Sequence, residues 1–249
     1  MLERLVRFLR GPIASASIRT TGVLALRLLF QAGHLIVLAR LLGPSQFGLL
    51  AAVMASAMLL GKLTTFGTQY PLLRSTAQGG DTATSVLSYA IPTTLTVGLI
   101  LLSVFLPAAY WLVQNQHDFG IWPLFAIATA ELLTAPLITL FAMAQLGRGR
   151  IASSQLIQTL PLGLRFLAAA ALFVTQSDQP LLLYATLYLG TSATTLTAML
   201  CTKAANPPSI KTWRLPRLIE LKEAAGFGVM DVATAAPSEI DKAIAPYLL

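Results

Sequence analysis

Six long apolar runs follow one another along this chain of 249 residues. The hydrocarbon core of a bilayer is about 30 Å thick, and about 20 apolar residues in a helix cross it. Only 11% of the residues are charged, against about 25% in soluble domains, so lipid must surround most of the chain. The predicted spans are Thr20–Leu42, Phe47–Gln69, Val86–Tyr110, Ile121–Gln145, Ile151–Val174 and Leu181–Cys201. The sequence therefore predicts an all-α membrane protein with six complete transmembrane helices and a partial seventh, Ala224–Leu249.

The distribution of Lys and Arg predicts the orientation of these helices. Alternate connections carry nearly all the basic residues, and the opposite connections hold Arg40 with Asp118 and Asp178. Because cytoplasmic loops are enriched in Lys and Arg, the N-terminus is predicted to be cytoplasmic. The net charge of +7 is then explained by topology and by contacts with anionic lipids, and we expect no nucleic-acid partner. The basic residues of the predicted cytoplasmic connections are Arg4, Arg7, Arg10 and Arg19, then Arg74, then Arg148 and Arg150, then Lys203, Lys211, Arg214, Arg217 and Lys222.

The same pattern divides the chain into four segments. Residues 1–19 are predicted to form a cytoplasmic amphipathic N-terminus, with Leu and Val on one face and Arg on another. Residues 20–201 form the six-helix transmembrane lobe. Residues 202–223 form a basic cytoplasmic linker, and residues 224–249 form a truncated first helix of a second lobe.

A stripe of polar residues in the first span predicts one wall of a cavity. Arg27, Gln31 and His34 are separated by four and three residues, which places them on one face of a helix. An intramembrane charge costs about 2.5–3.5 kcal/mol at the bilayer centre on insertion scales, so such residues usually serve a function. The alternative is that Arg27 extends to the nearby headgroups.

Glu131 and Arg165 are predicted to lie at similar depths in the fourth and fifth spans. One interpretation is a buried pair that neutralises charge between neighbouring helices. The other is that Arg165 faces a substrate phosphate while Glu131 orients it or exchanges a proton. Lys62, near the cytoplasmic end of the second span, is interpreted as an anchor at the membrane surface.

The last segment carries Asp231, Glu239, Asp241 and Lys242, which cannot all face lipid. If it spans the membrane, part of it faces a cavity or a partner helix, and Asp241 is a candidate coupling residue. The alternative is a tail that does not insert. Pro237 favours a kinked or discontinuous helix, a form that often lines a transport path.

The sequence lacks the motifs of the common enzyme classes. No phosphate-binding loop, zinc-protease motif or nucleophile elbow occurs, and His34 and His117 lie on different elements. The single cysteine, Cys201, excludes an intramolecular disulfide and a thiolate metal site. We therefore expect no catalytic residues, metal or cofactor.

A turn motif joins the first two spans. The residues 42–48 read Leu-Gly-Pro-Ser-Gln-Phe-Gly, and Phe66-Gly67 with Arg74 follows at the end of the second span. This combination resembles the polysaccharide transporter branch (O-antigen and exopolysaccharide flippases) of the multidrug/oligosaccharidyl-lipid/polysaccharide (MOP) superfamily. The specific motifs cover about the first 75 residues, and the remainder is similar in hydropathy and loop length.

The resemblance implies a multi-pass protein of the bacterial inner membrane with two lobes around a cationic cavity. Such a protein would move a polyprenyl-pyrophosphate-linked glycan between leaflets by alternating access, with Arg27 and Arg165 holding the pyrophosphate. Members of the family have about 12 to 14 spans, so this chain corresponds to a first lobe plus the opening helix of a second. A second lobe or a polysaccharide polymerase is an expected partner.

Two other functions stay open at this point. One is a cation-coupled multidrug or metabolite exporter of the same superfamily, a branch that favours acidic cavity residues. The other is a non-transporting membrane assembly factor or an inactive remnant, suggested by the missing second lobe.

Overall fold

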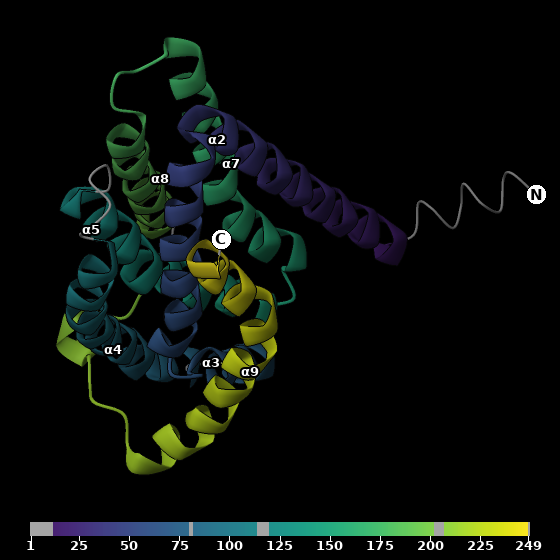
Figure 1. The fold of residues 1–249 in the computed structure, drawn as a ribbon. Helices are drawn as coiled ribbons and strands as arrows, with labels where there is room; N and C mark the ends of the chain where they lie inside the picture. The colour runs from purple at the N-terminus through teal and green to yellow at the C-terminus, as the bar shows by residue number, and fades with distance from the viewer. Residues whose placement is uncertain (1–11, 80–81, 114–119, 202–206, 249) are drawn as a thin grey trace, which may run out of the picture.

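The computed structural model describes the backbone of residues 12–79, 82–113, 120–201 and 207–248, and the side chains of residues 18–79, 83–113, 120–201 and 207–234. This described part consists of helices and connections without strands (Figure 1). In chain order the helices are α2 (Pro12–Thr64), α3 (Gln69–Gln78), α4 (Thr82–Val113), α5 (Ile121–Thr129), the π-helix η1 (Ala130–Thr134), α6 (Ala135–Gly147), α7 (Ile151–Thr175), α8 (Pro180–Cys201), the 3₁₀-helix η2 (Ile210–Thr212) and α9 (Leu218–Leu248).

Helix α2 contains the first predicted span and most of the second, joined at a sharp bend. Gly43 has non-helical backbone angles, with φ 73° and ψ 171°, and Pro44 follows it. Only glycine adopts such a positive φ readily, and proline is tolerated at the start of the next helical segment. The turn motif of the sequence therefore divides α2 into a first half (residues 12–42), which runs out to the side in Figure 1, and a second half (residues 44–64) inside the bundle.

Four helices in the described ranges are long and apolar enough to cross a membrane, namely Ile18–Thr64, Ala83–Val113, Ile121–Gly147 and Ile151–Thr175. The first of them includes the first predicted span and residues 47–64 of the second. Helix α8 corresponds to the sixth predicted span, but its Thr, Ser and Tyr residues lower its hydropathy. The membrane character of the chain is confirmed, whereas the count of six spans and the orientation stay predictions.

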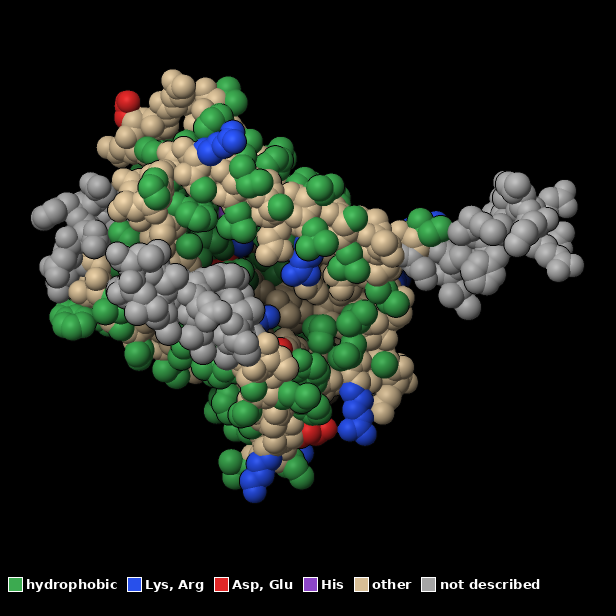
Figure 2. All heavy atoms as spheres, turned by 45° about the vertical axis from the view of Figure 1, so that its right-hand side comes forward, with side chains coloured by type: hydrophobic (Ala, Val, Ile, Leu, Met, Phe, Trp, Pro, Cys, Tyr) green, Lys and Arg blue, Asp and Glu red, His purple; other side chains and the backbone are tan. Residues whose placement is uncertain are grey.

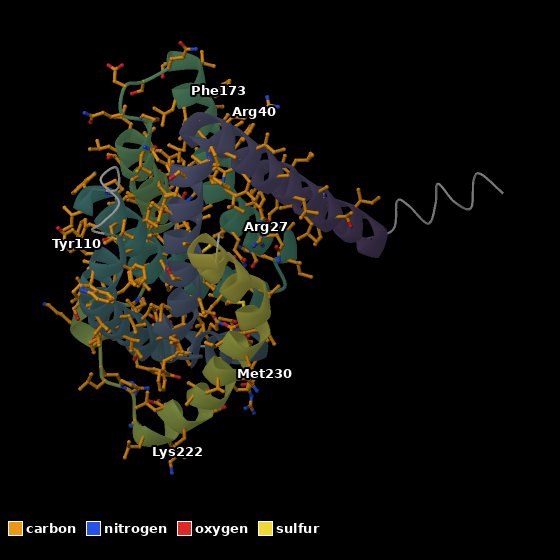
Figure 3. The ribbon with its side chains drawn as sticks, viewed as in Figure 1. Arg27, Arg40, Tyr110, Phe173, Lys222 and Met230 are labelled. Atoms are coloured by element: carbon orange, nitrogen blue, oxygen red, sulfur yellow. The ribbon has the colours of Figure 1, made fainter. Side chains whose placement is uncertain are left out.

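The helices place most of the basic connections at one end of the bundle. The first half of α2 runs parallel to α7, because Arg19 lies beside Ala152 and Phe30 packs on Phe166. The start of α2 and the α6–α7 turn with Arg148 and Arg150 therefore share this basic end. The bend at Gly43 and the α7–α8 connection lie at the opposite end, where Figure 3 labels Arg40 and Phe173. The main apolar core lies between them, where α2, α4, α5, α7 and α8 meet.

The connection before α9 is held against the lobe. The Trp213 side chain packs on a second apolar cluster formed by α3, α4, α6 and α8. The backbone N–H of Arg214 donates to the Ser88 carbonyl, and its guanidinium lies 4.8 Å from the centre of the Tyr89 ring. Glu220 accepts two hydrogen bonds from the Arg214 guanidinium, at 2.8 and 2.6 Å, and one from the Arg217 N–H. Helix α9 therefore begins at Leu218, inside the segment predicted as a linker.

Helix α9 packs on α2 and α3 through a close backbone contact at Gly67. Gly67 has a φ of +74°, and a Cβ there would lie 2.0 Å from the Ala224 carbonyl oxygen and 2.6 Å from the Gly228 nitrogen. The Phe-Gly motif at the end of the second predicted span thus has a steric reason, since any larger residue would separate α3 from α9.

Candidate functional site

A buried ion pair joins α7 to the middle of the fourth predicted span. The Arg165 Nη2 lies 3.0 Å from the Glu131 Oε1 and donates a second hydrogen bond, at 2.8 Å, to the Ser192 hydroxyl of α8. Each of the two charged residues is 5% exposed. The Tyr188 hydroxyl donates to the same Glu131 oxygen at 2.5 Å, and the Tyr188 ring lies 3.5 Å from the Arg165 guanidinium carbon. Both charges are therefore neutralised inside the lobe.

The position of Glu131 depends on a local change of helix type. Residues 130–134 form one π-helical turn between α5 and α6, and such turns are rare and often occur at functional sites. A π turn inserts an extra residue, which changes the direction of the following side chains. The Thr134 hydroxyl donates to the Ala130 carbonyl and satisfies one acceptor inside this turn.

His34 belongs to the same buried region but contacts a different partner. Its Nε2 lies 2.5 Å from the Tyr184 hydroxyl, and the two rings stack with centroids 5.7 Å apart. Tyr184 in turn packs edge-on against Tyr188. This contact joins the first half of α2 to α8, and His34 is only 4% exposed.

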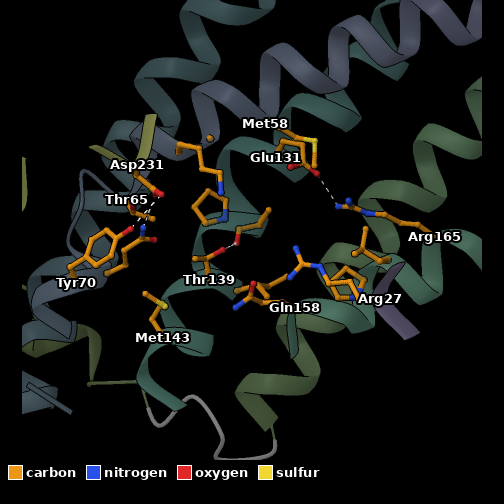
Figure 4. A pocket seen from close by; sticks show the side chains of 18 residues that line it. Arg27, Met58, Thr65, Tyr70, Glu131, Thr139, Met143, Gln158, Arg165 and Asp231 are labelled. Carbon is orange, nitrogen blue, oxygen red and sulfur yellow. Dashed lines mark hydrogen bonds and ion pairs between the residues drawn. The ribbon is translucent and has the colours of Figure 1, made fainter. Parts of the chain in front are cut away.

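A cavity of about 340 Å³ opens between α2, α3, the η1–α6 segment, α7 and α9 (Figure 4). Figure 2 shows this face of the molecule hollowed, with basic and acidic side chains near the hollow and hydrophobic side chains over much of the surrounding surface. The ionisable side chains that line the cavity are Arg27, Lys62, Tyr70, Glu131, Arg165 and Asp231. Uncharged polar residues in the lining include Thr65, Gln69, Thr139 and Gln158.

The two carboxylates of the cavity already have hydrogen-bond donors. Arg165 and Tyr188 bind Glu131, as described above. Asp231 of α9 accepts a hydrogen bond from the Gln69 amide at 2.8 Å and lies 3.4 Å from the Tyr70 hydroxyl. In contrast, Arg27 and Lys62 form no ion pair with any described residue. Among the described residues, these two cations of the lining therefore have no carboxylate partner.

The structure separates the residues that the sequence placed on one polar stripe. Arg27 is half-buried, lines the cavity and extends toward its interior in Figure 4. Gln31 is exposed on α2, outside the residues that line the cavity, and His34 is buried against Tyr184. The Asp241 side chain lies outside the described residues.

Sequence reasoning interpreted Lys62 as an anchor at the membrane surface; its side chain is exposed and also lines the cavity. Asp231 also lines it, as expected for a segment whose charged residues were predicted to face a cavity or a partner helix. Helix phase gave no signal for Lys62, because α2 ends at Thr64 and a turn with positive φ at Phe66 and Gly67 separates it from Gln69 of α3.

Solved structures of the MOP superfamily share this fold. One is a MOP superfamily transporter from Pyrococcus furiosus Vc1 (DSM3638), for which a reverse polarity of the binding pocket was taken to suggest a different function. It has a TM-score of 0.61 and 19% identity, covering 93% of this chain and 54% of that one. A MATE structure in complex with Br-NRF has a TM-score of 0.61 and 20% identity, covering 94% and 57%. A MATE structure in the bent conformation has a TM-score of 0.55, with 20% identity and coverage of 91% and 54%.

The chain thus spans little more than half the length of these transporters. A comparison with curated protein sequences gives no match. The sequence model of the family described as "Polysaccharide biosynthesis protein" matches residues 14–206, which include both halves of α2, the buried ion pair and the whole of α8. The chain therefore belongs to the polysaccharide biosynthesis protein family and has the fold of MOP superfamily transporters.

Proposed function

We propose that this chain forms one lobe of a transporter that moves a polyprenyl-pyrophosphate-linked oligosaccharide from the inner to the outer leaflet by alternating access. The family assignment and the MOP fold support a transporter of the polysaccharide pathway. We further propose six spans, a cytoplasmic N-terminus and a location in the bacterial inner membrane. Because the chain matches about half of its structural relatives, a second lobe would complete the transport path.

The observation that carries the proposal is a pair of cations in the cavity that have no ion-pair partner among the described residues. Arg27 and Lys62 both line it, and neither forms an ion pair with a described carboxylate. A guanidinium binds phosphate oxygens in a bidentate manner, and an ammonium binds them as a point charge. Two such groups on one cavity suit the two phosphates of a pyrophosphate.

Arg165 has a different part in this proposal. Its guanidinium is bound by Glu131 and Ser192 and covered by Tyr188, so a pyrophosphate would have to compete with a preformed ion pair. We therefore assign direct phosphate binding to Arg27 and Lys62. Arg165 and Glu131 fix the cavity wall between α7 and the π-helical turn.

A binding measurement on the purified chain tests the assignment. Farnesyl pyrophosphate serves as a short isoprenoid probe, and farnesol is the uncharged comparison. Loss of one charge-assisted hydrogen bond costs about 1.5–3 kcal/mol, so Arg27→Gln and Lys62→Gln are each expected to weaken binding about tenfold or more. Arg40→Gln, at the opposite end of the bundle, is the matched control and should bind like the parent. Equal affinity of all three variants, or equal binding of farnesol, would contradict the proposed site.

Complementation then tests transport. The chain is expressed in a bacterium that lacks its own O-antigen or exopolysaccharide flippase, alone or together with a second lobe, and polymer at the cell surface is measured. We expect surface polymer only when both lobes are present, and less of it with Arg27→Gln. Unchanged export by the Arg27 and Lys62 double variant would show that these cations do not hold the substrate during transport.

Export of cationic compounds is the second candidate function. Asp231 and Glu131 both line the cavity, and a carboxylate can attract a cationic drug or coupling ion. A cationic dye that binds the purified chain, with affinity lost in Asp231→Asn and kept in Arg27→Gln, would favour this alternative.

A further inference from the structure

A second groove follows the outer side of the seam between α2 and α7. Its volume is about 390 Å³, and it is lined by Arg19, Gly22, Val23 and Leu26 of α2 with Ala152, Ser153 and Leu156 of α7. The four α2 residues recur at intervals of three and four, so they form one face of the helix. No described residue lines both this groove and the cavity, and on α7 the groove residues lie on the opposite face from Gln158, which lines the cavity.

The groove has the polarity of a lipid site, with a charged end and an apolar length. Arg19 is exposed and is the one ionisable residue among the described residues of the lining. From Arg19 to Leu26 the helix rises about 10 Å, and that length presents Val23, Leu26 and Leu156. Arg19 therefore lies at the basic end of the bundle, and the apolar part extends from there into the hydrocarbon.

The charges around the open end favour an anion. Arg148 and Arg150 belong to the α6–α7 turn, directly before the groove residues of α7, and both are exposed. Within the described residues, neither these arginines nor Arg19 forms an ion pair, and no carboxylate lines the groove. Basic residues near a membrane surface attract anionic lipids, each by an amount equivalent to about fivefold in affinity.

We propose that this groove binds one anionic phospholipid of the leaflet at the basic end of the bundle. The Arg19 guanidinium binds the phosphate, and one acyl chain lies along Gly22, Val23, Leu26 and Leu156. The bound lipid fills the seam between the first half of α2 and α7 from the membrane side. This site is separate from the cavity and does not depend on the proposed substrate.

Two substitutions test the two parts of the site. Arg19→Gln removes the charge. Gly22→Leu fills the apolar part, and it does so without a clash because a Cβ at Gly22 meets no atom within 4 Å. Gly190→Leu is the matched control for the second change, since Gly190 is also an exposed helical glycine with no atom within 4 Å of a Cβ. Arg40→Gln is the control for the first.

The measurement is the titration of the purified full chain in detergent with fluorescent phosphatidylglycerol, with phosphatidylcholine of the same acyl chains as the neutral comparison. We expect at least fivefold weaker phosphatidylglycerol binding for Arg19→Gln and for Gly22→Leu, with both controls like the parent. Size-exclusion profiles identify any variant that fails to fold. Two lipids that bind equally well, or a Gly22→Leu variant that binds like the parent, would overturn the proposal.

Two competition arms distinguish the phospholipid from other anions. Inorganic phosphate is expected to compete weakly, because it has no acyl chain to place in the groove. If it displaces the lipid at comparable concentration, the groove itself is not used and the proposal fails. If farnesyl pyrophosphate displaces the lipid better than unlabelled phosphatidylglycerol does, the groove is a substrate site rather than a phospholipid site.

Discussion

The guanidinium of Arg165 and the carboxylate of Glu131 lie 3.0 Å apart in the interior of the lobe, each 5% exposed. The carboxylate oxygen in this contact also accepts the Tyr188 hydroxyl, and the same guanidinium nitrogen also binds Ser192. Three helical segments therefore meet at one pair of opposite charges. A pair with this many partners stabilises one arrangement of α7, α8 and the π-helical turn, and removal of either charge leaves the other buried without compensation.

Loss of one partner of this pair is expected to destabilise the lobe strongly. Breaking a buried ion pair from one side costs about 3–5 kcal/mol, so Glu131→Gln and Arg165→Met should each lower the midpoint of thermal unfolding in detergent by several degrees. The double variant should be more stable than either single variant, because no buried charge is left. Intrinsic tryptophan fluorescence during heating reports the transition, because Trp213 packs on the apolar cluster of the folded lobe.

The stability of the double variant tests whether the two charges of Glu131 and Arg165 stabilise each other. If the double variant is no more stable than the worse single variant, the two charges do not stabilise each other. Ser192→Ala is a milder reference, since it removes one hydrogen bond to Arg165 and leaves the ion pair.

Gly67 is expected to tolerate substitution far less well than Gly79. Both have positive φ angles, +74° and +75°, so alanine strains the backbone at each, at a cost of about 1–3 kcal/mol. Only at Gly67 would the new Cβ meet α9, 2.0 Å from the Ala224 carbonyl oxygen, whereas nothing lies within 4 Å at Gly79. Gly67→Ala should therefore cost about 1–3 kcal/mol more and separate α9 from α3. Thermal stability and the proteolysis of α9 measure the difference, and equal effects at the two glycines would refute the contact.

The linker contact around Glu220 is expected to weaken in acid. Hydrogen bonds from Arg214 lower the pKa of the Glu220 carboxyl below its ordinary value. A carboxyl with a lowered folded pKa stabilises the fold above its unfolded pKa, about 4.3 for glutamate, and this contribution is lost as the pH falls through the folded value. In a variant with Trp111 and Trp122 replaced by Phe, the emission of Trp213 should shift to the red below about pH 4.3. With Glu220→Gln as well, the shift should be present already at neutral pH.

The sequence allowed the helical class, the bend and the depth of the buried charges to be predicted. The apolar runs locate both halves of α2, and the Leu-Gly-Pro turn locates the bend between them. The bend needs a residue with a positive φ, which glycine adopts far more readily than other residues. Counting helical rises placed Glu131 and Arg165 at one level, and the structure pairs them. These features could be predicted because each depends on residues within one or two helical turns of the chain.

For Gln31 and Lys62, counting helical turns did not predict whether the side chain lines the cavity. Helix phase groups Gln31 with Arg27, but the pairing of the first half of α2 with α7 decides which part of that face meets the cavity. Lys62 was interpreted as a surface anchor, and its exposed side chain also lines the cavity together with residues of η1, α6 and α9. The π-helical turn at residues 130–134 has no marker in the sequence that we could identify.

His34 and Arg27 lie on the same half of α2, yet substitutions at the two residues are expected to affect different properties. The His34 Nε2 contacts the Tyr184 hydroxyl in the packed interior, and His34 does not line the cavity. His34→Ala should therefore lower thermal stability, by about 1–3 kcal/mol for a lost hydrogen bond with an unpaired buried group, while farnesyl pyrophosphate affinity changes by less than about threefold. Arg27→Gln should show the reverse, because its side chain contacts the cavity and no described partner loses an ion pair. In a double-mutant cycle, His34→Ala and Tyr184→Phe should be non-additive, since both remove the same hydrogen bond. A large loss of affinity in His34→Ala at unchanged stability would place His34 in the binding site and show that the polar stripe of the first span acts as one surface.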